Sequence, residues 1–349
     1  MKKTIIVFIF ILFITGASYS QSTEETLSNL SSDAATSYVE PIISAFGSNM
    51  NSGWVSGVPS ASILGLNLKL RVIAAGSFFS DDKRTFSTSG KFQFTSGQAD
   101  DILQASDITP ANHPTNYDDI KNEILSREWE VNISGPTIIG SDQEFVEVTF
   151  PGAQIQGETI DEYTNVLTDV KGFLNDIPLL PTPMLQLDVG TIIGTDVSIR
   201  YFPGIDIQDL GKFSLWGIGF MHNPGVWLAN PLPVDIGLGF FYQDLKIGNV
   251  FENKSYQYGA FISKEIGVII TFTPYAGVTL ESSRTTLNYT YNFDTEVGPQ
   301  STNVSFELDG ENNIALTGGV MLSLPVVSIN VDYKVAKVST LTAGVALGF

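Results

Sequence analysis

Residues 341–349 read L-T-A-G-V-A-L-G-F, and this run is the clearest indication of the fold. Apolar residues occupy one parity of this stretch, and Thr, Gly and Ala occupy the other. The first parity consists of Leu341, Ala343, Val345, Leu347 and Phe349. Alternation with period two indicates a β-strand that has one apolar face. The stretch therefore predicts a closing strand whose apolar face ends on an aromatic residue.

Nine further segments upstream repeat this period of two. The clear ones start near residues 64, 185, 268, 287, 314 and 327, and the weaker ones cover 213–221, 235–245 and 255–263. With the terminal stretch they make ten segments. The short polar run Glu281–Arg284 separates two of the clear segments and is predicted to be a tight turn.

Alternation fits a secreted β-sandwich as well as a membrane barrel. Three features favour the barrel. The segments are about 9–17 residues long, whereas strands of soluble proteins are most often about 5–6 residues long. Their polar parity is built from Gly, Thr, Ser and Asn, and aromatic residues gather near their ends, as in interfacial girdles. The predicted fold class is all-β, an antiparallel transmembrane β-barrel of 10–14 strands.

The first twenty residues have the pattern of a secretory signal peptide. Lys2 and Lys3 precede an apolar run, and small residues lead to a cleavage site between Ser20 and Gln21. Residues 21–54 follow with helical spacing and are predicted to form a periplasmic or luminal segment, a possible plug, whose helix stops at Gly47. Export through the secretory pathway to the cell outer membrane is the expected localisation.

Residues 64–349 are assigned to the barrel, and 78–184 to an acidic insertion that is expected to be extracellular. Residues 80–165 hold 16 of the 37 acidic residues and only 5 basic ones. Within the insertion, Phe86–Phe94 and Glu144–Phe150 could form one more hairpin, and Thr159–Leu174 is predicted to be helical. The formal net charge of −19 argues against a nucleic-acid partner.

Seven charged residues lie on the parity opposite the apolar face of their strands. They are Lys69, Arg71, Asp188, Asp196, Arg200, Asp332 and Lys334. Because a charge that faces lipid costs about 2–4 kcal/mol, these side chains are predicted to point into the lumen. They either pair across the lumen and hold the helix as a plug, or line a path that selects solutes. Closure of the first strand on the last would bring Lys69 and Arg71 near Asp332.

Residues for catalysis and metal binding are sparse. The chain has two histidines and no cysteine, which argues against zinc sites and thiol chemistry. His113 lies in a turn-rich loop, and His222 follows a strand, where a structural role is the ordinary one. No catalytic, cofactor-binding or metal-binding residue is assigned, and the chain is not expected to be an enzyme.

Several runs resemble an uncharacterised outer-membrane barrel family of the Bacteroidota. They are Tyr38–Trp54 (Y-V-E-P-I-I-S-A-F-G-S-N-M-N-S-G-W), Pro183–Pro203, Leu232–Leu245 and Thr273–Ser283. The helical segment before the barrel is also similar in plan to long-chain fatty-acid transporters of the FadL type. That similarity implies passage of small hydrophobic molecules past a plug, and it assigns no binding residue. The closing strand resembles the signal that barrel assembly machinery reads in bacterial outer-membrane proteins.

The leading functional prediction is passive transport or permeation of a small, possibly hydrophobic solute. The alternative is a non-transporting structural barrel, or one associated with assembly or secretion, and a membrane-embedded hydrolase is third. Expected partners are outer-membrane lipid, the barrel assembly machinery and an unknown small solute. The oligomeric state is not indicated. An open lumen would favour transport, whereas a lumen filled by paired charges and the helix would favour the structural role.

Overall fold

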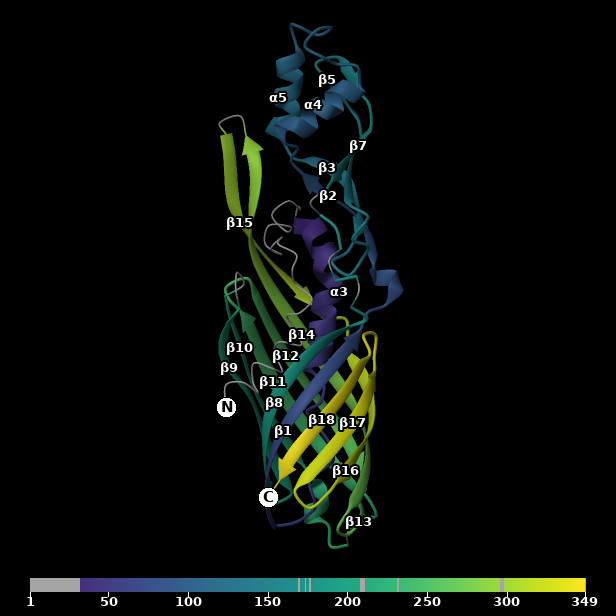
Figure 1. Ribbon diagram of the computed structural model, residues 1–349, viewed down its shortest axis with the longest axis vertical. Helices are drawn as coiled ribbons and strands as arrows, with labels where there is room; N and C mark the ends of the chain where they lie inside the picture. The colour runs from purple at the N-terminus through teal and green to yellow at the C-terminus, as the bar shows by residue number, and fades with distance from the viewer. Residues whose placement is uncertain are drawn as a thin grey trace.

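The computed structural model describes residues 32–168, 170–172, 174–175, 177–207, 211–230, 232–295 and 298–348 (Figure 1). The predicted signal peptide with its Ser20–Gln21 cleavage site, residues 21–31 and the terminal Phe349 lie outside the described residues.

Ten antiparallel strands close into a barrel, as the fold-class prediction expected. They are β1 (Leu64–Phe78), β8 (Leu179–Ile192), β9 (Thr195–Ile207), β10 (Gly211–His222), β11 (Asp235–Ile247), β12 (Phe251–Ser263), β14 (Thr271–Thr295), β16 (Ile314–Ser323), β17 (Val327–Val335) and β18 (Thr340–Gly348). Each pairs with the next in this order, and β1 pairs with β18 from Lys69 opposite Gly348 to Ser77 opposite Thr340. A two-residue strand, β13 (Ile266–Gly267), pairs with the start of β14. The closing strand therefore completes the sheet.

The number of strands is right, but two of the predicted boundaries are wrong. The segments starting near 268 and 287 are one strand, β14, and Glu281–Arg284 lies inside it instead of forming a turn. Polar residues are tolerated there because Glu281 and Ser283 point into the barrel and are buried. Conversely, the segment starting near 185 is two strands, β8 and β9, which turn at Ile193 and Gly194. The upper half of β14 pairs with β15 (Gly298–Asp309) and extends above the barrel.

The two faces of the barrel wall differ in polarity. Outward-facing residues are large, apolar and exposed, as in the row Leu316, Val320 and Leu322 of β16. Inward-facing residues are buried and mostly polar on β12, β14 and β17, whereas β1, β8, β10 and β11 contribute a buried apolar cluster. Within the part of the chain that the structure describes, no helix is long and apolar enough to cross a membrane.

The helix α3 (Ser32–Met50) runs down into the barrel from the end that carries the insertion (Figure 1). Its first half packs in the core of the insertion through residues such as Ala35 and Val39. Its second half lies in the lumen, where Met50 packs against Ile73 of β1. The helix thus belongs to both parts of the protein. It does not stop at Gly47, as predicted, but continues to Met50.

The insertion between β1 and β8 is a small α/β unit of its own. Its main sheet has the order β2 (Thr85–Phe92), β3 (Trp129–Pro136), β4 (Val146–Phe150) and β7 (Tyr163–Leu167). The helices α4 (Ser96–Ala105) and α5 (Tyr117–Ser126), the short helix η1 (Asp81–Lys83) and the hairpin of β5 (Ala153–Ile155) and β6 (Glu158–Ile160) complete it. Phe86–Phe94 and Glu144–Phe150 therefore supply strands of this sheet and add no barrel hairpin.

The predicted helix Thr159–Leu174 is wrong, because the segment contains strands β6 and β7. The apolar residues spaced three to four apart, Tyr163, Val170 and Leu174, each pack into the same apolar core from non-helical segments. The β-branched residues of the segment favour an extended chain. In this short segment, the three-to-four-residue spacing of apolar residues marks the residues that are buried and does not indicate a helix.

Gly47 is required for packing and not for stopping the helix. A Cβ at this position would collide with the side chain of Ser283 on β14. We expect Gly47→Val to lower the free energy of unfolding by about 1–3 kcal/mol, because overpacking forces the helix away from the wall. Denaturant titration in detergent micelles measures this. Gly97→Val is the control, since a Cβ at Gly97 meets nothing within 4 Å. Equal losses in both variants would contradict close packing at Gly47.

Candidate functional site

The candidate site is the barrel lumen, which is filled by residues 44–58, here called the plug. The plug comprises the last two turns of α3 and the loop that follows it. Its apolar residues Met50, Trp54 and Val55 pack against inward-facing side chains of β1, β8 and β10–β12. Gly53 adopts a φ of 69°, where only glycine fits between Ile73 and Thr342. The run S-N-M-N-S-G-W, residues 48–54, therefore forms the tightly packed part of the plug.

Three cations on the wall bind backbone carbonyls of the plug, at the end of α3 and in the loop that follows it. The Lys334 ammonium donates to the carbonyl of Ser48 at 2.7 Å. Arg200 donates to the carbonyls of Ser52 at 2.8 Å and Met50 at 3.3 Å. Arg71 donates to the carbonyl of Trp54 at 2.9 Å. The last carbonyls of a helix lack partners within the helix and carry partial negative charge. These cations therefore cap the plug.

Arg200 makes the densest set of contacts in the lumen. Besides the plug carbonyls, its guanidinium donates to the amide oxygens of Gln186 and Gln243, both at 2.8 Å. Its Cζ lies 3.7 Å from the centre of the Trp54 ring. The side chain is fully buried. Arg200 thereby joins the plug to three strands, β8, β9 and β11, through a planar group that stacks and donates at once.

Acidic residues of the wall pair with these cations or with neutral donors. Asp188 lies 3.7 Å from Arg71 and accepts from Gln186 and Ser198 at 2.6 Å each. Glu281 lies 3.1 Å from the Lys334 ammonium. Buried charges require such partners, because their removal from water is expensive.

The structure places the seven charges predicted to be luminal in two groups. Arg71, Asp188, Arg200, Asp332 and Lys334 are buried around the plug. Lys69 and Asp196 are half-buried and lie nearer the end of the barrel that holds the C-terminus. In the described part of the chain, the Lys69 ammonium has no hydrogen bond or ion pair.

The predicted neighbours of Asp332 are only partly right. Strands β1 and β18 do pair, but Asp332 lies on β17, one strand farther away. It accepts from the Tyr275 hydroxyl at 2.8 Å and from the Asn330 amide at 3.3 Å. Arg71 reaches only Asn330 on that strand, at 3.5 Å, and its ion-pair partner is Asp188. Arg71 therefore pairs with Asp188 on the adjacent strand β8, and not with Asp332, which lies two strands away on β17.

Sequence reasoning missed Glu281 and the polar residues of the plug. Asn49 donates to the carbonyl of Leu180 at 2.7 Å and to Thr182 at 2.9 Å. Ser48 shares a hydrogen bond with Thr340 at 2.6 Å. The available signal was the four small polar residues Ser48, Asn49, Asn51 and Ser52 on either side of Met50, which are unusual at the end of a helix that has an apolar stripe.

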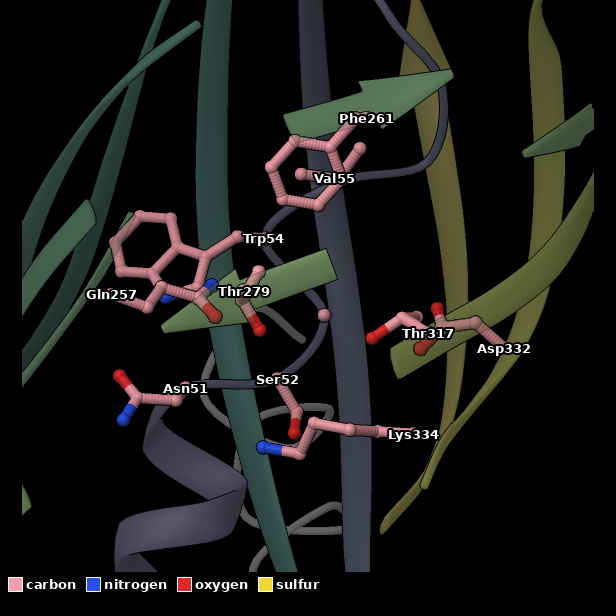
Figure 2. A pocket seen from close by; sticks show the side chains of 11 residues that line it. Asn51, Ser52, Trp54, Val55, Gln257, Phe261, Thr279, Thr317, Asp332 and Lys334 are labelled. Carbon is pink, nitrogen blue, oxygen red and sulfur yellow. The ribbon is translucent and has the colours of Figure 1, made fainter. Parts of the chain in front are cut away.

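A cavity of about 20 Å³ lies between the plug and the wall (Figure 2). Figure 2 shows Asn51, Ser52 and Trp54 of the plug opposite Thr317, Asp332 and Lys334 of β16 and β17. A cavity of about 10–15 Å³ holds one water molecule. This one therefore has room for water, but not for an organic solute.

Both histidines have side-chain partners. His222 accepts at Nε2 from the Trp227 indole at 3.1 Å, and its Nδ1 lies 2.9 Å from the Thr195 hydroxyl. Because indole N–H only donates, Nδ1 carries the proton of the neutral ring and cannot accept one from Thr195. His113 is in the insertion, where its Nδ1 lies 2.9 Å from the Asn112 amide oxygen and its Nε2 lies 3.6 Å from the Glu158 carboxylate. In the described residues, no group of three His, Cys, Asp or Glu could hold a metal ion.

One lysine joins the insertion, the helix and the barrel. Lys83 lies 3.3 Å from Glu40 of α3 and 3.1 Å from Glu311, in the turn between β15 and β16. Burial lowers the pKa of the Lys83 ammonium, but the hydrogen bond to Glu311 and the charge of Glu40 outweigh it, so the pKa is raised overall. The tie therefore persists throughout the neutral range.

A second charged cluster fixes the two insertion helices. Asp100 on α4 accepts from Lys121 at 2.6 Å and from the Tyr117 hydroxyl at 2.7 Å, both on α5. Burial raises the pKa of Asp100, but the bonds from Lys121 and Tyr117 outweigh it and leave the pKa below its ordinary value. Burial, followed by the bond to Asp100, raises the pKa of Tyr117 to about 12.

These pKa directions predict how the insertion responds to pH. A lowered carboxyl pKa stabilises the fold at neutral pH, and this contribution is lost as the pH falls below about 4. Asp100→Asn should therefore destabilise the insertion by less than about 1 kcal/mol at pH 7, because the pair is partly exposed, and by progressively less as the pH falls below about 4. Proteolysis of the insertion across this pH range measures the destabilisation. The exposed Asp101→Asn is the control, and a destabilisation that does not shrink as the pH falls would contradict the assignment.

The comparisons with known proteins add the family. No curated protein matches the chain. Similar solved structures include Ail, the attachment invasion locus protein of Yersinia pestis (8% identity, 82% of this chain and 100% of that one, TM-score 0.20). Others are OmpT, an outer membrane protein of Vibrio cholerae (7%, 82% and 97%, 0.22), and the transport unit of the autotransporter AIDA-I from Escherichia coli (8%, 88% and 98%, 0.24).

At TM-scores this low the likenesses carry no argument, and the barrel rests on the strand pairing of the chain itself. The similarity to FadL-type transporters and the origin in the Bacteroidota stay predictions. A family model matches the whole chain, residues 1–349, so the protein belongs to DUF6588, a family of unknown function.

Proposed function

We propose that this protein is an outer-membrane barrel whose closed lumen anchors the insertion at the membrane surface, without conducting solutes. The observation that carries the proposal is the plug, whose backbone carbonyls, at the end of α3 and in the loop after it, are held by Lys334, Arg200 and Arg71. A channel would need a continuous aqueous path. Between plug and wall the lumen offers a cavity of about 20 Å³.

Membrane location is supported by the outer surface of the barrel. Its outward-facing rows are exposed and apolar on successive strands, far beyond the few hundred Å² that soluble monomers expose. A closed sheet leaves no backbone edge unpaired, which is the condition for spanning a bilayer with strands.

The anchoring role is supported by α3. The first half of this helix is part of the apolar core of the insertion, and the second half is fixed in the lumen. The insertion is thus held to the barrel by a buried helix, by Lys83 and by two chain connections. Passive permeation of a small solute, the leading sequence prediction, would require the plug to leave, which would dismantle this attachment.

Accessibility on intact cells tests the proposal. Since the chain has no cysteine, the labelling of single introduced cysteines reports which end of the barrel is accessible from outside the cell. Ser89→Cys places a thiol on the exposed face of β2, and Ser60→Cys places one at the opposite end of the barrel. A membrane-impermeant maleimide should label S89C on intact cells and S60C only after lysis. Labelling of S60C alone on intact cells would show that the insertion faces the periplasm and would refute surface presentation.

A further inference from the structure

The end of the barrel opposite the insertion has an unusually apolar rim. Two neighbouring connections form it, 223–234 between β10 and β11, and 264–270 between β12 and β14. Their exposed large apolar residues are Trp227, Leu228, Leu232, Ile266, Val268, Ile269 and Ile270. Val268 is 94% exposed, which is extreme for an apolar side chain in a folded protein. We call these two connections the apolar rim.

The other end of the barrel lacks this feature. In its short connections that the structure describes, 248–250, 310–313 and 336–339, no large apolar side chain is exposed. At the rim end, even the tight turns carry exposed apolar residues, Ile193 between β8 and β9 and Leu324 between β16 and β17. The two ends therefore meet different surroundings.

Charged and polar side chains mark where the lipid-facing band of the barrel ends. On β12 the outward residues Tyr256, Tyr258 and Ile262 lie between Lys254 and Lys264. Ten residues of a strand tilted by about 40° span about 26 Å, close to the apolar band of about 25 Å in outer-membrane barrels. Lys264 therefore lies at one membrane boundary, and residues 265–270 lie at or beyond it.

On β10 the same distance separates Lys212 from His222. Trp216 and Phe220 face outward between them. The indole nitrogen of Trp227 donates to His222 Nε2 at 3.1 Å, so its ring lies at the same boundary. Tryptophan prefers this depth, where its ring is in lipid and its N–H remains hydrogen-bonded.

From this we propose that the apolar rim is a lipid-binding surface, which inserts into the boundary between headgroups and acyl chains of the leaflet on its side. The inference rests on the membrane location proposed above. The occupant is lipid because the rim continues the outward apolar rows, with Ile270 directly below Phe272 of β14. Apolar segments at this boundary bury about 5–10 Å into it. The rim thus fixes the depth of the barrel in the bilayer.

Four tryptophans allow a direct test in phosphatidylcholine vesicles. Trp54 and Trp129 are 3% and 8% exposed and are shielded from lipid, whereas Trp216 and Trp227 are 48% and 68% exposed. Fluorescence quenching is measured with lipids brominated either near the carbonyl or in the middle of the acyl chain. W216F should lose most of the mid-chain quenching, and W227F should lose most of the shallow quenching.

The outcomes separate the two proposals. If W216F loses mid-chain quenching but W227F quenches like the native protein at both depths, and aqueous iodide reaches Trp227, the rim lies in water and is open to a soluble protein. That result overturns the lipid-binding rim and leaves the membrane barrel intact. If neither lipid quencher acts on the native protein, the barrel is not in the bilayer, and the proposed function fails as well.

Discussion

Replacing Arg200 with alanine should lower the free energy of unfolding by about 3–5 kcal/mol, the largest loss expected of any single luminal substitution. The guanidinium is fully buried and donates to Ser52, Gln186 and Gln243 at 2.8 Å each. Truncation leaves these acceptors without partners in a lumen that has little room for water. It also removes the cation that stacks on Trp54.

Two variants show whether the effect comes from these contacts. Arg200→Lys keeps the charge, but an ammonium group lacks the planar set of N–H donors of the guanidinium. We therefore expect its loss in the free energy of unfolding to be smaller than that of Arg200→Ala and larger than that of Lys69→Ala. Lys69→Ala removes a cation that is also on the inward parity and is only half-buried, and it should cost less than about 1 kcal/mol. Denaturant titration in detergent micelles measures all three. Equal losses for Arg200→Ala and Lys69→Ala would contradict the role of Arg200 as the clamp of the plug.

Replacing Tyr38 with alanine should destabilise the insertion by about 3–5 kcal/mol while the barrel stays folded. Tyr38 lies in the first half of α3, is completely buried in the core of the insertion, and donates its hydroxyl to the carbonyl of Lys171 at 2.8 Å. Its own carbonyl accepts from the backbone of Ile138. Removing the ring opens a cavity where the helix and the insertion share a core.

Limited proteolysis and heat resistance on a gel separate the two parts of the protein. In Tyr38→Ala, cleavage within residues 79–178 should accelerate at least tenfold, and the folded barrel should keep its native mobility up to the same temperature. Tyr38→Phe, which loses only the hydrogen bond to Lys171, should lose about 1 kcal/mol. If Tyr38→Ala also lowered the heat resistance of the barrel, helix and barrel would not be separable as described.

Most barrel strands could be predicted from the sequence, because a strand with one apolar face shows apolar residues at every second position. The pairing of β1 with β18 followed from the closing strand at 341–349. Boundaries were harder. Glu281–Arg284 has the composition of a turn, yet it continues β14 because its inward side chains find partners in the lumen. The turn at Ile193–Gly194 was missed since Ile193 is apolar and preserves the alternation.

Inward parity also placed Arg71, Arg200 and Lys334 in the lumen, but not their partners. Their partners in the plug are backbone carbonyls, and no side-chain pattern in the sequence marks these carbonyls. They become available only because α3 enters the barrel and ends there. The secondary structure of the insertion was the hardest part to predict. Its elements are short, and its core is completed by α3, which lies outside the insertion in the sequence.

Single-channel recording of the purified full-length protein in planar bilayers tests the central claim most directly. We expect no conductance from the intact protein, because the plug fills the lumen and three cations of the wall hold its backbone carbonyls. Under the same conditions, a protein that lacks residues 32–58 should either conduct or fail to insert. Stable, reproducible conductance steps from the intact chain would contradict the closed lumen and restore solute permeation as the leading function.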